Sequence, residues 1–389
     1  MRIAPVSLYN RQRVDGGTKR GGGVLHDLRC WLVVGWRLSL YAAYRLRLRK
    51  PPNLLDIRPE AAGMFSNILH WPRTLRVVNP EYCPDKGPAI FVSNHLFFFD
   101  PTFAYRAINL ATDEKLEPYF MMRNDFFNQS AILRLIDVDT LVACIGAYGI
   151  TRGDVKLSQL KPFLKLLQAD ESFIMFPGRT RSESGLFMEY RDEIEDPGGA
   201  SFFLHATQRR KPGVPVPAVP MARTYNPVHD QSAYAFGEPL YLAENADRDT
   251  QREFDLELMD RMGDLVELNA AQLLSAILYL RCLHGVPTPL SFDSAAERIR
   301  AILDEVPQRL QHPNLASDTR GEVAATARFL ENAGQVRIED AAIVPDADAI
   351  LAAPDLEDGY RKANPAKYLA NQLIHLMDVV RALDRHALT

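Results

Sequence analysis

The sequence predicts an α/β fold: a mixed sheet covered by helices on both faces, followed by a mainly helical C-terminal region. Two observations favour this fold. Short apolar runs typical of buried strands alternate with amphipathic helical patterns up to residue 243, and only helical patterns dominate beyond it. The expected strands are 75–78, 89–92, 119–122, 141–145, 172–176 and 214–221. The helices expected between them are 60–69, 126–136, 155–167 and 199–207. Three prolines within 214–221 indicate an edge or irregular strand.

The C-terminal region is expected to form a separate, mainly helical domain. The predicted helices are 259–280, 295–303, 323–330 and an amphipathic helix at 367–383, with a small β element at 335–344. We therefore predict three parts: a basic N-terminal segment (1–55), an α/β domain (56–250) and a helical domain (251–389).

Composition excludes several classes of protein. The chain has 389 residues, of which 47% are hydrophobic and 24% charged, as in an ordinary globular protein with room for two or three domains. A net charge of −4 gives no general affinity for nucleic acid. The four cysteines are scattered without a Cys-x-x-Cys pair, so we expect neither a disulfide framework nor a metal site.

The first part of the chain has the composition of a membrane-surface segment. Residues 1–50 carry a net charge of +9, which leaves −13 for the rest. An apolar run at 30–44 contains Trp31 and Trp36, is interrupted by Arg37 and is followed by a basic cluster at 45–50. The run is too short to span a bilayer, so it predicts a helix lying in the membrane interface, with the protein peripheral or monotopic at the cytoplasmic face. The alternative is a helix packed on the protein's own core.

His95 and Asp100 form the first candidate site. The apolar run 89–92 ends in Ser93-Asn94-His95, and Asp100 precedes Pro101 in a pattern typical of a helix start, with Asp100 as N-cap. If the two side chains meet, a carboxylate on one imidazole nitrogen leaves the other nitrogen free to act as a base. The alternative is a loop histidine beside an ordinary helix cap.

Arginines follow two further predicted strands. Gly146 precedes Arg152, and the segment 177–182, Pro-Gly-Arg-Thr-Arg-Ser, contains Arg179 and Arg181. Ligands of open α/β sheets gather at strand ends, and the planar guanidinium fork suits phosphate. These arginines therefore indicate a phosphate site near His95. The alternative is that each one is a solvated surface charge.

Taken together, these segments resemble the glycerolipid acyltransferase family, which includes the lysophosphatidate and glycerol-3-phosphate acyltransferases. Four motifs occur in the family's order: Asn-His-x4-Asp at 94–100, Gly-x5-Arg at 146–152, Phe-Pro-Gly-Arg-Thr-Arg-Ser at 176–182, and a Pro-rich strand at 214–221. The resemblance covers about residues 60–245. It implies a glycerol-3-phosphate acyltransferase-like fold and an O-acyltransferase of phospholipid biosynthesis.

Two departures from the family pattern affect the acceptor. Gly178 replaces the acidic residue of the third motif and Arg179 replaces the glycine after it, while Phe97 stands where the first motif often has a small residue. The late Tyr368-x-x-Asn371-x-x-x-His375 segment is similar to the glycerol-3-phosphate acyltransferase branch. The identity of the acceptor therefore stays open.

The resemblance implies a role for each matching residue. His95 is the general base, and Asp100 orients and charges its ring. The residues implied in acceptor binding are Asn94, Thr151, Arg152, Gly178, Arg179, Thr180, Arg181 and Ser182. No cofactor is implied, since the co-substrate is acyl-CoA or acyl-ACP. The implied partners are this thioester donor, a phosphorylated glycerol or lysolipid acceptor, a membrane surface and, if the donor is acyl-ACP, acyl carrier protein.

Two rival interpretations remain. One is a non-catalytic lipid-binding or scaffold protein that kept the fold, and the intact His95 and Asp100 pair argues against it. The other is acyl transfer to a non-phosphorylated acceptor such as an amino-lipid, which Arg152 and Arg181 disfavour. The absence of Gly-x-Ser-x-Gly from the sequence weakens a serine hydrolase interpretation.

Overall fold

The computed structural model describes residues 24–50, 74–123, 137, 141, 146–150, 157–178, 180–189, 199–353 and 359–388. The helices expected at 60–69 and 126–136 lie outside these residues.

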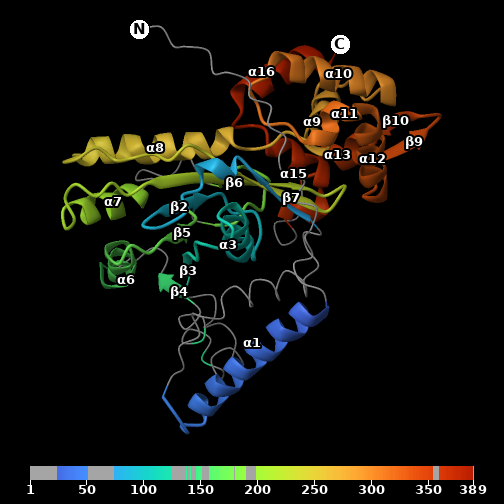
Figure 1. Ribbon diagram of the computed structural model, residues 1–389. Helices are drawn as coiled ribbons and strands as arrows, with labels where there is room; N and C mark the ends of the chain where they lie inside the picture. The colour runs from blue at the N-terminus through green and yellow to red at the C-terminus, as the bar shows by residue number, and fades with distance from the viewer. Residues whose placement is uncertain are drawn as a thin grey trace.

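A seven-stranded mixed sheet forms the centre of the α/β domain, in the order β1-β7-β6-β2-β5-β3-β4 (Figure 1). Its strands are β1 (Thr74–Val78), β2 (Ile90–Ser93), β3 (Tyr119–Arg123), β4 (Ala147–Ile150), β5 (Phe173–Met175), β6 (Ala218–Asn226) and β7 (Gln231–Phe236). All neighbours run parallel except β6 and β7, so β1 and β7 run opposite to the other five strands.

Helices cover both faces of this sheet, as predicted. Because side chains alternate along a strand, Phe91 of β2 packs on one face and its neighbours Ile90 and Val92 pack on the other. Helix α3 (Asp100–Ala111) covers the face of Phe91. The helices that cover the opposite face are α6 (Leu157–Gln168), α7 (Ala200–Gln208) and α8 (Arg248–Asp264) (Figure 1). The predicted fold class is confirmed.

Two strand predictions need correction, and one strand of the sheet was not predicted. The strand expected at 141–145 is wrong at Leu141, which is helical, and the strand of this segment is β4. A short apolar run fits a helix as well as a strand, which explains the error. The strand expected at 214–221 lies at Ala218–Asn226 and is interior, because two of its three prolines precede it and only Pro220 lies within it. Strand β7 follows β6 as an antiparallel neighbour and is absent from the predicted strands.

The C-terminal region forms its own helical layer around α9 (Ala270–Leu283). It also contains α10 (Phe292–Glu305), α11 (Pro313–Ser317), α12 (Thr319–Asn332), α13 (Ala347–Leu351), α14 (Gly359–Ala363), α15 (Pro365–Asn371) and α16 (Met377–His386). A three-stranded sheet completes it: β8 (Leu290–Ser291), β10 (Ala342–Pro345) and β9 (Val336–Glu339), in that order. The small β element predicted at 335–344 is therefore confirmed.

Two predicted helices of this region are each broken into two. The helix expected at 259–280 is α8 and α9, separated where Asn269 and Gln272 form a reciprocal capping box. The helix expected at 367–383 is α15 and α16. Helical periodicity continued across both breaks in the sequence. At the first break the capping residues were the stronger signal, whereas α16 begins after Leu376 without a side-chain cap.

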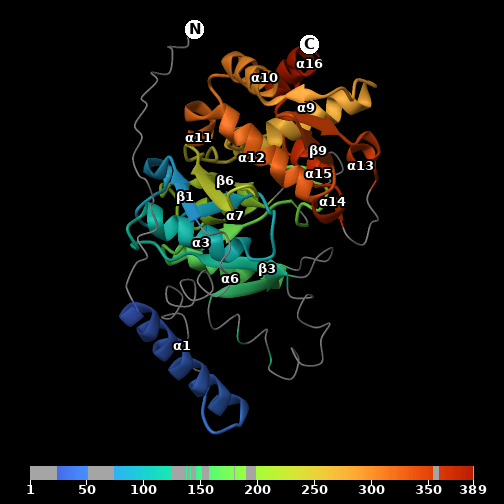
Figure 2. The same cartoon turned by 90° about the vertical axis from the view of Figure 1, so that its right-hand side faces the viewer.

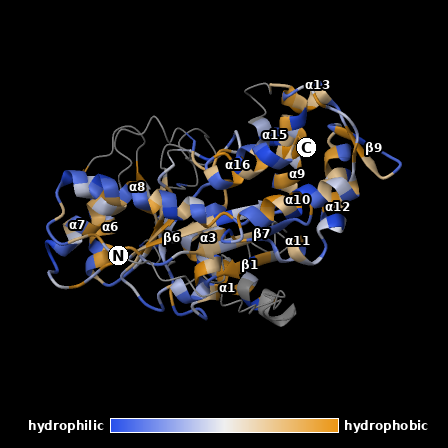
Figure 3. Ribbon diagram, turned by 90° about the horizontal axis from the view of Figure 1, so that it is seen from above, coloured by the Kyte–Doolittle hydropathy of each residue, from blue (hydrophilic) through white to orange (hydrophobic). Residues whose placement is uncertain are grey.

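The α/β domain and the C-terminal region have separate hydrophobic cores. Helix α8 contributes Leu258 and Met262 to the core of the sheet, whereas the second core begins at Leu268 and centres on α9. In Figure 3, α8 is largely hydrophilic and α9 largely hydrophobic, as expected for an outer and an inner helix. The domain boundary predicted between residues 250 and 251 stays a prediction.

Helix α1 (Val24–Arg45) lies apart, on the opposite side of the sheet from the C-terminal helices (Figures 1 and 2). The Tyr41 hydroxyl donates a 2.8 Å hydrogen bond to the Asp137 carbonyl, and Arg45 forms a 3.0 Å ion pair with the Asp137 carboxylate. In the part of the chain that the structure describes, no helix combines the length and the apolar character needed to cross a bilayer.

Candidate active site

His95 and Asp100 meet in the loop between β2 and α3. His95 Nδ1 lies 2.9 Å from Asp100 Oδ2, and the backbone N–H groups of Leu96 and Phe97 donate to the same oxygen at 2.5 and 2.7 Å. Asp100 is the first residue of α3, and Phe99 is its N-cap without a side-chain hydrogen bond. The predicted N-cap role of Asp100 is therefore wrong: its carboxylate turns back to bond the His95 loop instead of the helix.

The environments of the two side chains differ. Asp100 is completely buried, whereas the His95 side chain is 22% exposed and its ring packs 4.8 Å from the ring of Phe176. Burial raises the pKa of Asp100, but the nearby Arg223 guanidinium, His95 and the Phe97 N–H outweigh it and hold the pKa below its ordinary value. The carboxylate therefore stays ionised on one side of a histidine that solvent reaches from the other.

Asn94 holds this loop on the sheet. Its side-chain oxygen accepts a 2.7 Å hydrogen bond from the Arg223 N–H, and its side-chain nitrogen donates a 3.0 Å bond to the Arg223 carbonyl. These two hydrogen bonds extend the pairing of β2 with β6 past Ser93, and the Asn94 side chain is buried.

The loop that contains the third motif and extends to residue 189, here called the third-motif loop, lies directly beside His95. The Ser182 N–H donates a 2.8 Å hydrogen bond to the His95 carbonyl, so Thr180, Arg181 and Ser182 are brought to the candidate base. Ser182 is buried, and its hydroxyl accepts a hydrogen bond from the Gly185 N–H within the loop. The Arg181 guanidinium is 40% exposed, 3.9 Å from Glu183, and its Cζ lies 5.9 Å from the Phe98 ring centroid. Thr151, Arg152 and Arg179 lie outside the described residues.

Gly178 is the position where the family has an acidic residue. A Cβ atom added there would lie 3.0 Å from Met188 Cγ, which is closer than almost all real contacts. The space next to this backbone position is therefore filled by a methionine side chain. Another carboxylate, that of Glu189, is bound to this loop. Its Oε1 accepts hydrogen bonds from the backbone N–H groups of Glu183 and Ser184.

Residues of the C-terminal region complete the surroundings of the site. The Arg361 guanidinium lies 3.9 Å from the ring centroid of Phe97, and the Asn371 side chain donates a 2.7 Å hydrogen bond to the Ser184 carbonyl. Tyr368 is almost fully buried, and burial raises its pKa to about 12. The Tyr368-x-x-Asn371 spacing was the available signal for this contact, but nothing in the sequence indicated Arg361 or Arg223.

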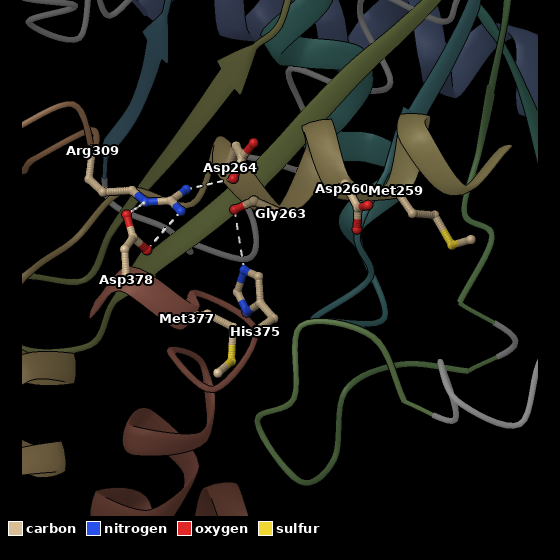
Figure 4. Close-up of a pocket in the computed structure, with 8 residues that line it drawn as sticks. All are labelled: Met259, Asp260, Gly263, Asp264, Arg309, His375, Met377 and Asp378. Atoms are coloured by element: carbon tan, nitrogen blue, oxygen red, sulfur yellow. Dashed lines mark hydrogen bonds and ion pairs between the residues drawn. The ribbon is translucent and has the colours of Figure 1, made fainter. Parts of the chain in front are cut away.

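A separate cavity of about 350 Å³ lies between α8 and the C-terminal region (Figure 4). Arg309 in its wall forms ion pairs with both Asp264 and Asp378, so its charge is used within the wall. His375 lines the same cavity, where its Nε2 lies 3.2 Å from the Gly263 carbonyl oxygen. His375 thus belongs to the support between domains. Among the described residues, no three His, Cys, Asp or Glu side chains group so as to hold a metal ion.

Residues 74–221 match the family model described as Acyltransferase. This segment is an acyltransferase domain, and the match supports the glycerolipid acyltransferase family inferred from the motifs. The comparison with curated proteins found no match.

Among solved structures, the chain is similar to the "Crystal Structure of the 1-acyl-sn-glycerophosphate (LPA) acyltransferase, PlsC, from Thermotoga maritima". The two share 14% sequence identity with a TM-score of 0.33, over 60% of this chain and 92% of that chain. The similarity is too distant to carry an argument, so nothing about substrate is transferred from that protein.

Proposed function

We propose that this protein transfers a fatty acyl group from acyl-CoA or acyl-ACP to the hydroxyl of glycerol 3-phosphate or a lysophospholipid. The observation that carries the proposal is the 2.9 Å contact between His95 Nδ1 and the buried, ionised Asp100 carboxylate. With Nδ1 directed at Asp100, Nε2 remains available as the base. The acyltransferase domain supports the reaction class.

The reaction needs no covalent enzyme intermediate. His95 Nε2 takes the proton of the acceptor hydroxyl as its oxygen forms a bond to the thioester carbonyl carbon. The C–S bond then breaks, and the departing thiolate receives the proton from the imidazolium. Asp100 stabilises the imidazolium between these two steps. Base catalysis of this kind typically contributes a factor of about 10²–10⁴ in rate.

The third-motif loop supports a phosphorylated acceptor. Its hydrogen bond to the His95 carbonyl keeps the half-exposed Arg181 guanidinium close to the base. A guanidinium can bond two phosphate oxygens and so fix the distance of the hydroxyl from His95. Arg152, Thr151 and Arg179 stay in the proposal as acceptor residues on the motif alone. We assign Asn94 to support of the loop, since its amide is already bonded to Arg223.

One observation favours a different acceptor as the second candidate. Met188 occupies the space beside Gly178, where the family has an acidic side chain. This change supports an acceptor whose contacts differ from those of the family's usual substrates, while leaving the base unchanged.

We further propose that α1 attaches the protein to a membrane surface. Tyr41 and Val34 are buried, whereas Trp31, Leu32 and Trp36 are each more than half exposed. Leu32 and Trp36, four residues apart, are neighbours on the helix surface. Apolar side chains followed by a run of basic residues are typical of helices that lie in an anionic lipid interface. Such attachment suits an enzyme with a lipid product.

A thiol-release assay tests the proposed function. Long-chain acyl-CoA is offered with glycerol 3-phosphate, lysophosphatidate, lysophosphatidylcholine or no acceptor, and acyl-ACP replaces acyl-CoA in a parallel series. We expect release only with a phosphorylated glycerol or lysophospholipid acceptor. Release with another lipid would favour the second candidate, and binding without release under every condition would support a non-catalytic lipid-binding protein.

A further inference from the structure

Arg223 of β6 is an arginine buried inside the α/β domain, with 1% of its surface exposed. Its Cζ lies 4.5 Å from the ring centroid of Phe97 and 4.7 Å from that of Phe103. Burying a guanidinium is unfavourable unless a charge and hydrogen bonds compensate for the lost water. The partners of Arg223 therefore decide what it does.

The two oxygens of the Asp100 carboxylate have different partners, and Arg223 binds one of them. Its Nη1 donates to Asp100 Oδ1, while Oδ2 receives the two backbone N–H groups of the loop and faces His95 Nδ1. The remaining donors Nε and Nη2 bond the Ser232 hydroxyl at 3.1 and 2.8 Å. Rotation of the carboxylate would break these bonds, so its orientation toward His95 is fixed from behind.

The sheet places Arg223 at the level of the His95 loop. β6 runs parallel to β2 with Met221 opposite Ser93, and Asn94 bonds the Arg223 backbone beyond that pair. Tyr234 of β7 lies opposite Arg223 on the other side, and its hydroxyl donates a 3.3 Å hydrogen bond to the Asp100 carbonyl. Both neighbouring strands thus anchor the backbone that carries the guanidinium.

We propose that Arg223 is a positioning residue for acyl transfer, which holds Asp100 Oδ1 so that Oδ2 stays directed at His95 and whose charge opposes protonation of the His95–Asp100 pair. This inference rests on the proposed function. Because Asp100 also binds the Arg223 guanidinium, it can orient the neutral His95 ring without binding a proton tightly onto it.

The charges around Asp100 fix the direction of the expected pH effect. Asp100 faces His95 of its own loop, Arg223 of β6 and Tyr234 of β7. Arg361 and Tyr368 of the C-terminal region also interact with it electrostatically. Burial raises the pKa of Asp100, and Arg223 is the leading influence that lowers it. Loss of Arg223 removes a positive charge, so protonation of the His95–Asp100 pair becomes easier and the base is lost at a higher pH.

The test is the pH profile of kcat/KM for thiol release by Arg223→Met, Arg223→Lys and the control Arg281→Met. Arg281 is another buried arginine, bonded to Thr288 and the Ala387 carbonyl in the C-terminal region. For Arg223→Met we expect the plateau of kcat/KM to be about 10- to 100-fold lower. We also expect the acidic limb of the pH profile to lie about one pH unit or more higher. Arg223→Lys should lower the plateau of kcat/KM without moving the acidic limb. Arg281→Met should change neither the plateau nor the position of the acidic limb.

An acidic limb in Arg223→Met at the wild-type position would overturn the proposal. If that variant does not fold, Arg223→Lys decides: a lowered plateau supports the fixed orientation, and a wild-type plateau contradicts it.

A readout without turnover separates this inference from the proposed function. The ¹⁵N NMR signals of the His95 imidazole, assigned with His95→Gln, report its tautomer and protonation. We expect the Nδ1–H tautomer in the wild type, and protonation at a higher pH in Arg223→Met. Identical titrations of the two proteins would overturn the role of Arg223. Absence of thiol release by the wild type would reject the proposed function alone.

Discussion

The side-chain amide of Asn371 donates a 2.7 Å hydrogen bond to the backbone carbonyl of Ser184, in the third-motif loop. The Tyr360 N–H likewise donates to the Glu183 carbonyl, and the Tyr368 backbone packs directly against Gly185. The C-terminal region thus holds the loop that carries Arg181. Although the family model ends at residue 221, the site depends on residues well beyond it.

We expect Gly185→Ala to destabilise the protein through this contact. Gly185 has a φ of +92°, and an added Cβ would lie 2.1 Å from the Tyr368 carbonyl oxygen. The matched control is Gly213→Ala, because Gly213 also has a positive φ (+77°) but no atom within 4 Å of an added Cβ. In urea unfolding, the control should lose about 1 kcal/mol from backbone strain and Gly185→Ala about 2–4 kcal/mol. Equal losses would mean that the loop moves freely from Tyr368.

His95→Ala should lower the rate of acyl transfer at least about a hundredfold, which is the smallest loss expected for a general base. The fold should persist, because the partly exposed ring of His95 contributes little to the core. Asp100→Asn should also lower the rate, since the ring loses its charged partner. The control is His284→Ala, at an exposed position after α9. Steady-state thiol release measures all three, and a His95→Ala rate above a hundredth of wild type would reject the base assignment.

Arg181→Ala should mainly raise the KM for a phosphorylated acceptor and leave the KM for the thioester nearly unchanged. This follows if the guanidinium contacts the acceptor phosphate equally in the ground and transition states. Arg152→Ala should behave in the same way. Arg337→Ala removes an exposed arginine of β9 and serves as the control. An equal loss with a phosphate-free acceptor would count against the phosphate contact.

The contact between His312 and Gln231 should make stability depend on pH. His312 Nε2 lies 3.1 Å from Gln231 Oε1, and Nδ1 accepts a hydrogen bond from the Asn314 N–H, so the ring is held neutral. Burial, followed by the charge of Arg76, lowers its pKa from 6.5 to about 4. Between these values the unfolded chain binds the extra proton, so stability is full above about pH 6.5 and falls as the pH decreases.

Urea unfolding at pH 7 and pH 5 measures this effect. Wild type should lose about 2 kcal/mol more than His312→Asn over that interval. Asparagine is chosen because it can still cap α11. His284→Asn, at an exposed site, should follow the wild type. If His312→Asn also follows it, His312 titrates equally in the folded and unfolded states.

Sequence periodicity predicted the α/β sheet and its two helical faces because these features depend on local patterns. It misplaced β6, since prolines that precede a strand look the same in sequence as prolines within it. The motifs predicted His95, Asp100 and the Arg181 loop, which lie within short segments. Arg223 and Arg361 were missed because their roles arise from long-range pairing, of β6 with β2 and of the C-terminal region with Phe97. No local signal separates such residues from ordinary surface arginines.

Helix α1 should bind anionic membranes through its exposed face. Trp31 and Trp36 supply apolar area, and Arg47, Arg49 and Lys50 each add about 1 kcal/mol near an anionic surface. We expect Trp31→Glu/Trp36→Glu to reduce flotation with anionic liposomes strongly. The control is Tyr241→Glu, because Tyr241 is also an aromatic side chain more than half exposed, but lies outside α1. Wild-type binding should weaken with salt without disappearing, since salt screens the charges but not the apolar contacts. Unchanged flotation of the double variant would show that another surface binds the membrane.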